Sequence, residues 1–565
     1  MNSDLEKRTS SGLVPESTRG RAGMSGRSRL PWLGCILAAL LFNLSVRAEN
    51  GTGETVTHDP EPTFHVGEIA IEGENPLSRK VTAGVLEPFV DREQSIETLR
   101  ELTASFEKAL AVKGFNFYTA IIPPQTLDEN LLRLQVIHID IADINVVGNK
   151  FFSEENIRLS LPLIASGRSP NTKKIASALL LAEENPAKDI RVVFLKGQDP
   201  QTVDANISVS DKNPNEIFFW ANNAGSELTT DTRLGLQYHN RNLWGRDHQI
   251  ALSYTVSPED TGELQQFGVN YRLPLYRLRG MANVFYSQSD VDTGRVADVF
   301  DVSGAGETTG IGYTQYLDIH GGYQHKLLLS VVDKLFDNDV LFESSNIGTD
   351  VRSRPLSIDY ISRFDRTNWL LNSTISHSTN LSGGAFNNDR SYRAARVGAE
   401  QGWSKQNLSM RFDYRWNQDW SSRALLFAQT TADSLISGEK FGLGGALGDL
   451  GPRGFLEREV MVDEGFKASF EVIRSFHTRR MQLGAFYDYA SGDHNNPQVG
   501  EPADETLASI GLIYKWKVRP DVSLNIDYGY VLNGVDQAFN AGTDDSDSRL
   551  HLSISYYPAW PWSGK

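Results

Sequence analysis

The residue whose chemistry stands out in this sequence is Arg453, inside the glycine-rich run "FGLGGALGDLGPRGF" from Phe441 to Phe455. A guanidinium stays protonated at physiological pH and can donate two parallel hydrogen bonds to one carboxylate. The many glycines leave few bulky side chains around it, so the run can fold compactly and enter a confined space. An unpaired guanidinium would be costly there, so the pattern predicts an acidic partner. If the run stays outside, the arginine is simply solvated.

Motifs that would support enzymatic chemistry are missing from the sequence. The phosphate-binding pattern GxxxxGK[ST] does not occur, and no GxSxG forms a strand-turn-helix elbow. Five scattered histidines show neither HExxH nor another ligand spacing: His239, His248, His320, His325 and His377. The acidic stretch "GTDDSDS", Gly542–Ser548, lacks the glycine and terminal glutamate of an EF-hand, which indicates a surface loop. We therefore expect no enzymatic activity, no cofactor and no metal.

Composition points to a β-rich protein of more than one unit. The 565 residues exceed one ordinary core, and 27 Phe, 19 Tyr, 10 Trp and 48 Gly suit strands joined by tight turns. The net charge of −16, without a block of Lys and Arg, argues against nucleic acid as a partner. Composition does not separate stacked β-sandwiches from a transmembrane barrel, because a barrel alternates its apolar residues.

The first 48 residues are typical of a secretory signal peptide. Two arginines precede an apolar core, Leu30–Leu44, and small or β-branched residues precede a cleavage site after Ala48. A transmembrane helix is the alternative, and Met24 is an alternative start to Met1. Cys35 is the single cysteine, so the mature chain would have none, which suits an oxidising envelope and excludes a disulfide scaffold.

After a polar linker, residues 49–63, one supersecondary pattern occurs twice. In residues 64–138 a short strand is followed by a helix with apolar residues at helical spacing, closed by Gly114, and then by two strands. A short first helix before Ser95 would complete the order β-α-α-β-β. Residues 139–212 show the same order, so we predict an internal repeat of two α+β units.

From residue 213 to 565 the apolar residues alternate with period two. In "MQLGAFYDY", Met481–Tyr489, one face is apolar, while Asp488 lies on the other face. About sixteen such segments follow one another without the boundaries of separate sandwiches. Aromatic residues at segment ends suit a membrane-interface girdle: Trp220, Tyr489, Trp516 and Tyr556–Tyr557. We therefore predict an all-β transmembrane barrel of about 16 antiparallel strands.

Within this barrel the glycine-rich run becomes a loop, residues 439–460, between the eleventh and twelfth segments. Gly444, Gly445 and Gly451 would let it fold compactly and thread into the lumen. Asp488 is the expected partner of Arg453, because its strand alternation points it inward.

The whole arrangement resembles the TpsB transporters of two-partner secretion (ShlB/FhaC/HecB-like), which carry POTRA domains before an outer-membrane barrel and are relatives of the assembly factor BamA. The motifs that carry this resemblance are "FGLGG", "GPRGF" (Gly451–Phe455), "AFYDYASGD", "IIPPQTLDENLLRLQV" and "AEENPAKDIRVVFLKGQ". It implies that Arg453, Gly454 and Phe455 form the loop tip, with Asp488 as partner. Two departures are Pro452 in place of the usual valine and a C-terminus that runs past the expected last strand. No plug helix is evident in residues 49–62.

The resemblance implies a function in protein export. The chain would lie in the bacterial outer membrane, with its POTRA domains in the periplasm, and would export a secreted TpsA-like partner protein. Its other partners would be outer-membrane lipid and the barrel-assembly machinery that inserts it. The client-binding residues are left open, with POTRA strand edges as the expected place, because added strands need no particular sequence. An assembly factor of the same superfamily and a passive porin are the alternatives; the client and the oligomeric state are not specified by the sequence.

Overall fold

A computed structural model describes most of residues 63–558. The parts of that range that are not described are 127–129, 226–230, 260, 262–263, 290–294, 297–299, 302–305, 337–340, 343–344, 347–349, 447–450, 478, 499–500 and 536–541. The predicted signal peptide and almost all of the linker lie outside the described residues.

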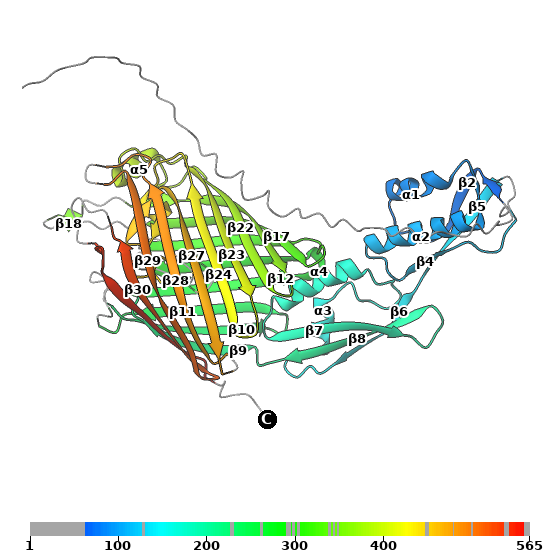
Figure 1. Cartoon of the computed structure of the whole chain (residues 1–565), viewed down its shortest axis with the longest axis horizontal. Coiled ribbons are helices and arrows are strands. Elements are labelled where there is room, and N and C mark those ends of the chain that lie inside the picture. The colour runs from blue at the N-terminus through cyan, green and yellow to red at the C-terminus, as the bar shows by residue number, and fades with distance from the viewer. Residues whose placement is uncertain are drawn as a thin grey trace, which may run out of the picture. The chain divides into compact units, whose positions relative to one another are not determined.

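The first α+β unit is a three-stranded sheet covered by two helices (Figure 1). Its strands have the order β2-β5-β4, with β2 parallel to β5 and β4 antiparallel to it. Ser95 and Thr98 cap α2 reciprocally, and the buried face of this helix carries Leu102, Phe106 and Leu110. The elements of this unit are β2 (Glu68–Gly73), α1 (Arg79–Leu86), η1 (Glu87–Phe89), α2 (Ile96–Val112), β4 (Tyr118–Ile121) and β5 (Leu131–His138). The pair β1 (Phe64–Val66) and β3 (Arg92–Gln94) is an addition that the sequence pattern did not reveal.

The second unit repeats this topology. Its sheet has the order β6-β8-β7, with β6 parallel to β8 and β7 antiparallel to it. Ser153 and Asn171 cap its two helices through their side chains. Its elements are β6 (Asp140–Val147), α3 (Glu154–Ser160), α4 (Thr172–Glu183), β7 (Lys188–Lys196) and β8 (Thr202–Asp211). The repeat of β-α-α-β-β is therefore present in the structure.

A closed antiparallel β-barrel follows, and the expectation of about sixteen strands is confirmed. β20 and β21 both pair with β17 and form one strand interrupted at Arg354, so the described residues contain sixteen barrel strands. The strands are β9 (Asn215–Asn222), β10 (Arg233–Leu243), β11 (His248–Val256), β12 (Gln265–Leu275), β13 (Gly280–Ser289), β16 (Gly306–Tyr316), β17 (Tyr323–Phe336), β20 (Val351–Ser353), β21 (Pro355–Asp365), β22 (Trp369–Asn380), β23 (Ser404–Arg415), β24 (Trp420–Thr430), β27 (Glu464–Phe476), β28 (Met481–Asp493), β29 (Asp504–Arg519), β30 (Val522–Asn533) and β31 (Ser548–Tyr556).

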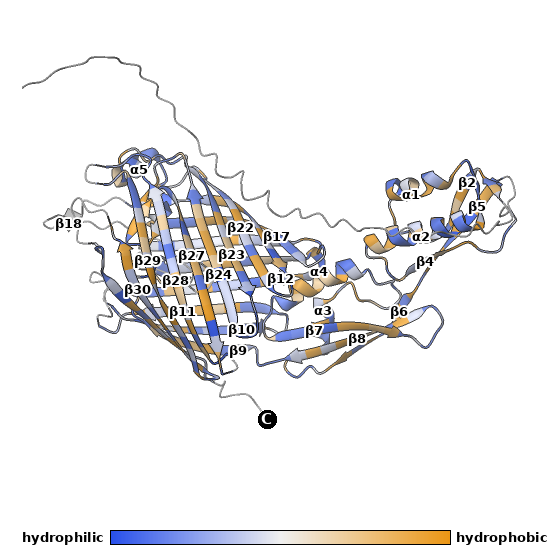
Figure 2. Cartoon of the chain, in the orientation of Figure 1, coloured by the Kyte–Doolittle hydropathy of each residue, from blue (hydrophilic) through white to orange (hydrophobic). Residues whose placement is uncertain are grey.

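The alternation of the sequence accounts for the two faces of the barrel wall, visible as alternating colours along the strands in Figure 2. Outward residues are apolar and exposed, as Leu483 (48 %) and Leu512 (63 %) illustrate. Their neighbours point inward, where Asp488 is 1 % exposed. An outer face of this kind is stable only against hydrocarbon.

One residue of the expected aromatic girdle was assigned to the wrong face. Trp220 follows Phe219, which is exposed on the outer face, so Trp220 points into the lumen. There its ring covers Gly235, where an added Cβ would lie only 2.0 Å from the indole. Trp220 therefore fills space left by a glycine on the inner wall instead of contacting lipid.

The connections differ in length between the two ends of the barrel. Those beside the second unit are short, and the β12–β13 turn contains η3 (Tyr276–Leu278). Those at the opposite end are longer and hold small elements: β14 (Arg295–Val296), β15 (Phe300–Asp301), β18 (Leu341–Phe342), β19 (Ser345–Asn346), α5 (Asp389–Ala395), η4 (Ser437–Glu439), β25 (Phe441–Leu443) and β26 (Val460–Val462). Across the described ranges, no helix has the length and apolar character needed to cross a membrane.

Candidate functional site

The glycine-rich loop connects β24 to β27, the eleventh and twelfth strands, as the sequence predicted. Its base is a small hairpin in which β25 pairs with β26. The loop packs through a cluster of wholly or nearly buried side chains against the inner wall: Leu443, Phe455, Val460, Val462, Ala490, Leu507 and Val531. Because Ala490, Leu507 and Val531 come from β28, β29 and β30, the loop lies inside the barrel.

Arg453 and Asp488, which the sequence paired, are in direct contact. The Nε and Nη2 atoms of Arg453 donate to the two carboxylate oxygens of Asp488, each at 2.8 Å. The backbone N–H of Arg453 also donates to Asp488, at 3.0 Å. The guanidinium carbon lies 3.6 Å from the ring centroid of Phe486, which supports it from one side. The arrangement fixes both the position and the orientation of the arginine.

Two acidic groups besides the predicted Asp488 surround Arg453. Its Nη1 donates to Glu471 at 2.8 Å and lies 3.6 Å from a carboxylate oxygen of Asp527. Ser469 accepts from Nη2 and donates to Asp488. Glu471 and Ser469 share the inward face of β27, so the same alternation that selected Asp488 could have found them.

Gly454 and Phe455 anchor the backbone of the tip. Gly454 has φ +100°, and its backbone packs directly on that of Gly529. An added Cβ on Gly454 would lie 3.2 Å from Val531, while one on Gly529 would lie 2.6 Å from the nitrogen of Gly454. The N–H of Gly454 donates to His551, and Phe455 is fully buried. The backbone of the loop tip therefore contacts the backbone of the barrel wall directly, with no side chain between them.

The three other predicted glycines lie along the loop. Gly444 and Gly445 both have positive φ, and an added Cβ at Gly445 would lie 2.2 Å from Glu457. Gly451 lies beside Asp488, with 3.2 Å between its hypothetical Cβ and the carboxylate. Its peptide bond to Pro452, the departure from the usual valine, is cis.

A second anchor, which no sequence pattern indicated, lies at the base of the loop. Glu439 is 1 % exposed and accepts from Lys334 and Lys405 at 3.0 Å each and from Ser353 at 2.9 Å. Burial alone would raise the pKa of Glu439, but the two lysines hold it at about 2. These partners come from β17, β20 and β23, so no local pattern in the sequence connects them.

The other end of the loop is fixed by Asp463, which immediately precedes β27. Its carboxylate accepts from Arg396 at 2.6 Å and from the backbone of Leu435 and Asn495. Arg396 follows α5, whose Tyr392 is fully buried in the same region. The connection that contains α5 thus holds both ends of the lumen loop in place.

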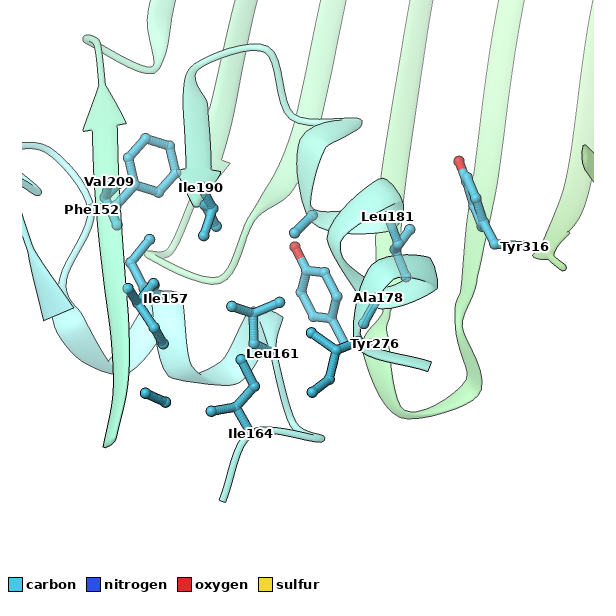
Figure 3. Close-up of a cluster of buried hydrophobic side chains, with 14 of the residues drawn as sticks. Phe152, Ile157, Leu161, Ile164, Ala178, Leu181, Ile190, Val209, Tyr276 and Tyr316 are labelled. Atoms are coloured by element: carbon cyan, nitrogen blue, oxygen red, sulfur yellow. The ribbon is translucent and has the colours of Figure 1, made fainter. Parts of the chain in front are cut away.

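The second unit is joined to the barrel through a shared hydrophobic core. Figure 3 shows Tyr276 of the β12–β13 turn beside Leu161, which follows α3, and Ala178 of α4. Tyr316 of β16 belongs to the same cluster. Met281 of β13 belongs to the same buried cluster. Because the core spans both parts, the second unit is packed onto the barrel end rather than tethered by its linker alone.

A buried ion pair lies within this joint. Lys188 of β7 forms a short hydrogen bond to Asp247 in the β10–β11 turn, and both side chains are at most 1 % exposed. Ser160 and Tyr276 donate to the same Asp247 oxygen, at 2.9 and 2.6 Å. Burial lowers the pKa of Lys188, and Asp247 opposes that shift. The pair is fully hydrogen-bonded, as a buried pair must be to persist.

A second polar bridge reaches the inner wall. Glu184, at the end of α4, accepts from Lys326 at 3.0 Å and from Arg272 at 3.3 Å. Burial raises the pKa of Glu184, but the two cations bring it below its ordinary value. The last turn of α4 therefore lies at the mouth of the lumen.

The histidines of the described residues do not gather into a metal site. His248 bonds to Tyr271, while His325 bonds to Tyr360. Over the described ranges no group of three His, Cys, Asp or Glu side chains is arranged to hold a metal.

The fold and this site define a class: an outer-membrane barrel with an inserted loop, preceded by repeated β-α-α-β-β units. Residues 64–138 match the ShlB-type POTRA domain, and residues 202–512, more than half of the chain, match the haemolysin secretion/activation protein family ShlB/FhaC/HecB. The chain belongs to this family. Its members are two-partner secretion transporters, so the chain lies in the outer membrane with its POTRA region in the periplasm.

Solved structures agree on the fold. CdiB from Escherichia coli is similar with a TM-score of 0.70 at 17% identity, over 90% of this chain and 93% of that one. CdiB from Acinetobacter baumannii is similar with a TM-score of 0.67 at 15% identity, over 88% and 91%. No sequence among curated proteins matches the chain. The two identities are too low to transfer residue roles, so these rest on the contacts above.

Proposed function

We propose that the chain exports one secreted partner protein through its barrel lumen and that the Arg453 loop is a latch that holds the lumen in an export-competent form. The observation that carries the latch is the bidentate pair of Arg453 with Asp488 inside the wall. A loop so bound lines the route that a client would follow, and its polar contacts are made without any reacting group. We assign the chain no enzymatic reaction and no cofactor.

The electrostatics of the tip support a latch role. One loop cation faces three carboxylates, those of Asp488, Glu471 and Asp527. Removing the cation leaves these three inward acids close together, with Arg423, which lies 3.4 Å from Glu471, offsetting only part of their charge, and this favours displacement of the tip. The wall itself keeps its strand pairing, so barrel insertion should survive.

The route into the lumen starts at a sheet edge. In the second unit the edges are β6 and β7, and β7 carries exposed Val193 and Leu195. An extended client can add a strand there through main-chain hydrogen bonds. Outer-membrane lipid and the assembly machinery that inserts the barrel complete the proposed partners.

The experiment compares a strain lacking the chain with strains that restore it as wild type, Arg453→Ala or Arg480→Ala. Arg480, exposed in a periplasmic turn, is the control. We expect wild type and the control to release one large protein, and Arg453→Ala to reduce its release tenfold or more, on the order of 1.4 kcal/mol, at equal barrel abundance. Normal release by an abundant Arg453→Ala protein would reject the latch. A normal secretome with depleted outer-membrane barrels in the deletion strain would favour an assembly factor.

A further inference from the structure

A groove of about 880 Å³ lies between α3 of the second unit and two periplasmic turns of the barrel. The β10–β11 turn supplies Trp244 and Arg246, and the β12–β13 turn supplies Arg277 and Leu278. Leu159 of α3 lines the opposite side. Trp244, Leu278 and Leu159 are 71%, 62% and 48% exposed, so the groove presents a large apolar surface. Neither the lumen loop nor the ion-pair joint explains why these residues are exposed.

The groove opens on the membrane-facing side of the wall. Trp244 packs edge-on against His248 and Tyr271, with ring centroids 5.6 and 6.3 Å apart. By strand alternation Tyr271 shares its face with Phe267, which is exposed on the outer wall. Trp244 therefore lies at the periplasmic edge of the outer face, which is the level at which tryptophan side chains contact lipid headgroups.

Two guanidinium groups at the groove are available to a ligand. Arg246 and Arg277 are exposed, and within the described residues neither side chain has an ion pair. By contrast, Arg279 pairs with Asp318, and Arg158 on the lining pairs with Glu154. Glu155 is the one carboxylate among the lining residues, so cationic groups are in excess. An apolar surface beside unpaired arginines is complementary to an amphipathic anion.

We propose that this groove binds a glycerophospholipid of the inner leaflet, with its phosphate held by Arg246 and Arg277 and its acyl chains against Trp244 and Leu278. A guanidinium presents paired donors that match phosphate oxygens. An anionic headgroup gains more from two such groups than a zwitterionic one. A bound lipid would bridge α3 and both turns and so fix the second unit at the membrane surface. The proposal does not depend on the latch, because it concerns the outer side of the wall.

The first test is native mass spectrometry of the full chain in detergent with added dioleoylphosphatidylglycerol. We expect one lipid to be retained by wild type and its affinity to fall roughly tenfold or more in Arg246→Gln/Arg277→Gln, since each arginine contributes separately near a phosphate. The matched control is Arg480→Gln/Arg519→Gln, which removes one exposed arginine from another periplasmic turn and one from the periplasmic end of β29. An equal loss of affinity in both double variants would overturn the site.

The second test locates the acyl chains. Phosphatidylglycerol with brominated acyl chains should quench a part of the tryptophan fluorescence that disappears in Trp244→Phe, and quenching equal to wild type in that variant would overturn the placement. Inorganic phosphate should not displace the bound lipid, whereas displacement by phosphate alone would show a simple anion site. Unchanged lipid affinity in Arg246→Gln/Arg277→Gln with reduced export would assign the groove to the client polypeptide and reject the proposal.

Discussion

At the scale of single residues, the lumen loop depends on arginine geometry as much as on charge. The Nε and Nη2 atoms of Arg453 both reach Asp488 while Nη1 reaches Glu471. A lysine has one compact ammonium and cannot form this planar fork, so it could not satisfy both carboxylates in the same way. The choice of arginine therefore follows from the arrangement of the wall.

Gly454→Ala tests the direct packing of two backbones. The substitution places a Cβ 3.2 Å from Val531 on a residue with φ +100°, so we expect a cost of about 1–3 kcal/mol and displacement of the tip. Export should fall, and the barrel should lose heat resistance in a gel-shift unfolding series. Gly402→Ala is the control, because nothing lies within 4 Å of its added Cβ. Equal behaviour of the two variants would show that the close approach to Gly529 has no functional weight.

At the scale of elements, the sequence predicted one half of the site and not the other. Asp488 was found because strand alternation alone decides which way it points, and the same rule applies to Glu471. Glu439 was not found, because it lies in η4, outside the strands, where no alternation indicates which way a side chain points towards Lys334 and Lys405. Trp220 was misplaced for another reason: its position at a segment end was taken as a sign of lipid contact, whereas strand alternation turns it inward, where Gly235 leaves room for its ring.

Glu439→Gln tests the base anchor of the loop. The change leaves Lys334 and Lys405 without their buried counter-charge, and we expect a loss of about 3–5 kcal/mol near neutral pH. Glu400→Gln is the control, since its exposed pair with Arg393 should contribute at most about 1 kcal/mol. Thermal unfolding in detergent, followed by gel shift, measures both. A small effect at Glu439 would show that the lysines find other partners.

The stability difference between wild type and Glu439→Gln should depend on pH, with a sign that follows from the pKa of Glu439. The pKa of Glu439 is about 2 in the folded chain, below the ordinary value of 4.5. The stabilisation from its ionised form is therefore fully present above pH 4.5 and is lost as the pH falls towards 2. We expect the advantage of wild type over Glu439→Gln to shrink by roughly 3 kcal/mol across this window. An advantage that stays constant with pH would contradict the ionised anchor.

Lys188→Met tests the joint between the second unit and the barrel. It leaves Asp247 charged and buried, which should cost about 3–5 kcal/mol, whereas Lys188→Met/Asp247→Asn should recover most of that loss. Trypsin cleavage after Lys212, in the connection between β8 and β9, measures how often the joint opens. Arg191→Met is the control on the same strand, because its pair with Asp189 is exposed. Cleavage that stays at the wild-type rate in Lys188→Met would show that the hydrophobic core holds the joint without the ion pair.

At the scale of the whole molecule, the sequence predicted the sixteen-stranded barrel and the repeat before it, because period two and the helix signals persist over many residues. It did not predict how the barrel closes. β31 pairs with β9 only over Ser553–Tyr556 and Phe219–Asn222, whereas β27 and β28 pair over their full length. Asn223 extends the junction through its side chain, which bonds to Leu550 and Leu552. The junction is thus the shortest ladder described in the wall, and it is the place where a lateral exit would open.

A disulfide across this junction separates export through the lumen from release through the wall. Asn222→Cys/Ser553→Cys places two cysteines at directly paired positions, where a bond can form without moving the strands far. If the client passes through the lumen, as we propose, the oxidised double variant should export at nearly the wild-type rate, and reductant should change little. Each single cysteine variant controls for the substitutions themselves. Export that stops on oxidation and returns on reduction would place the exit between β9 and β31, and the Arg453 loop would then act on the wall rather than on a central passage.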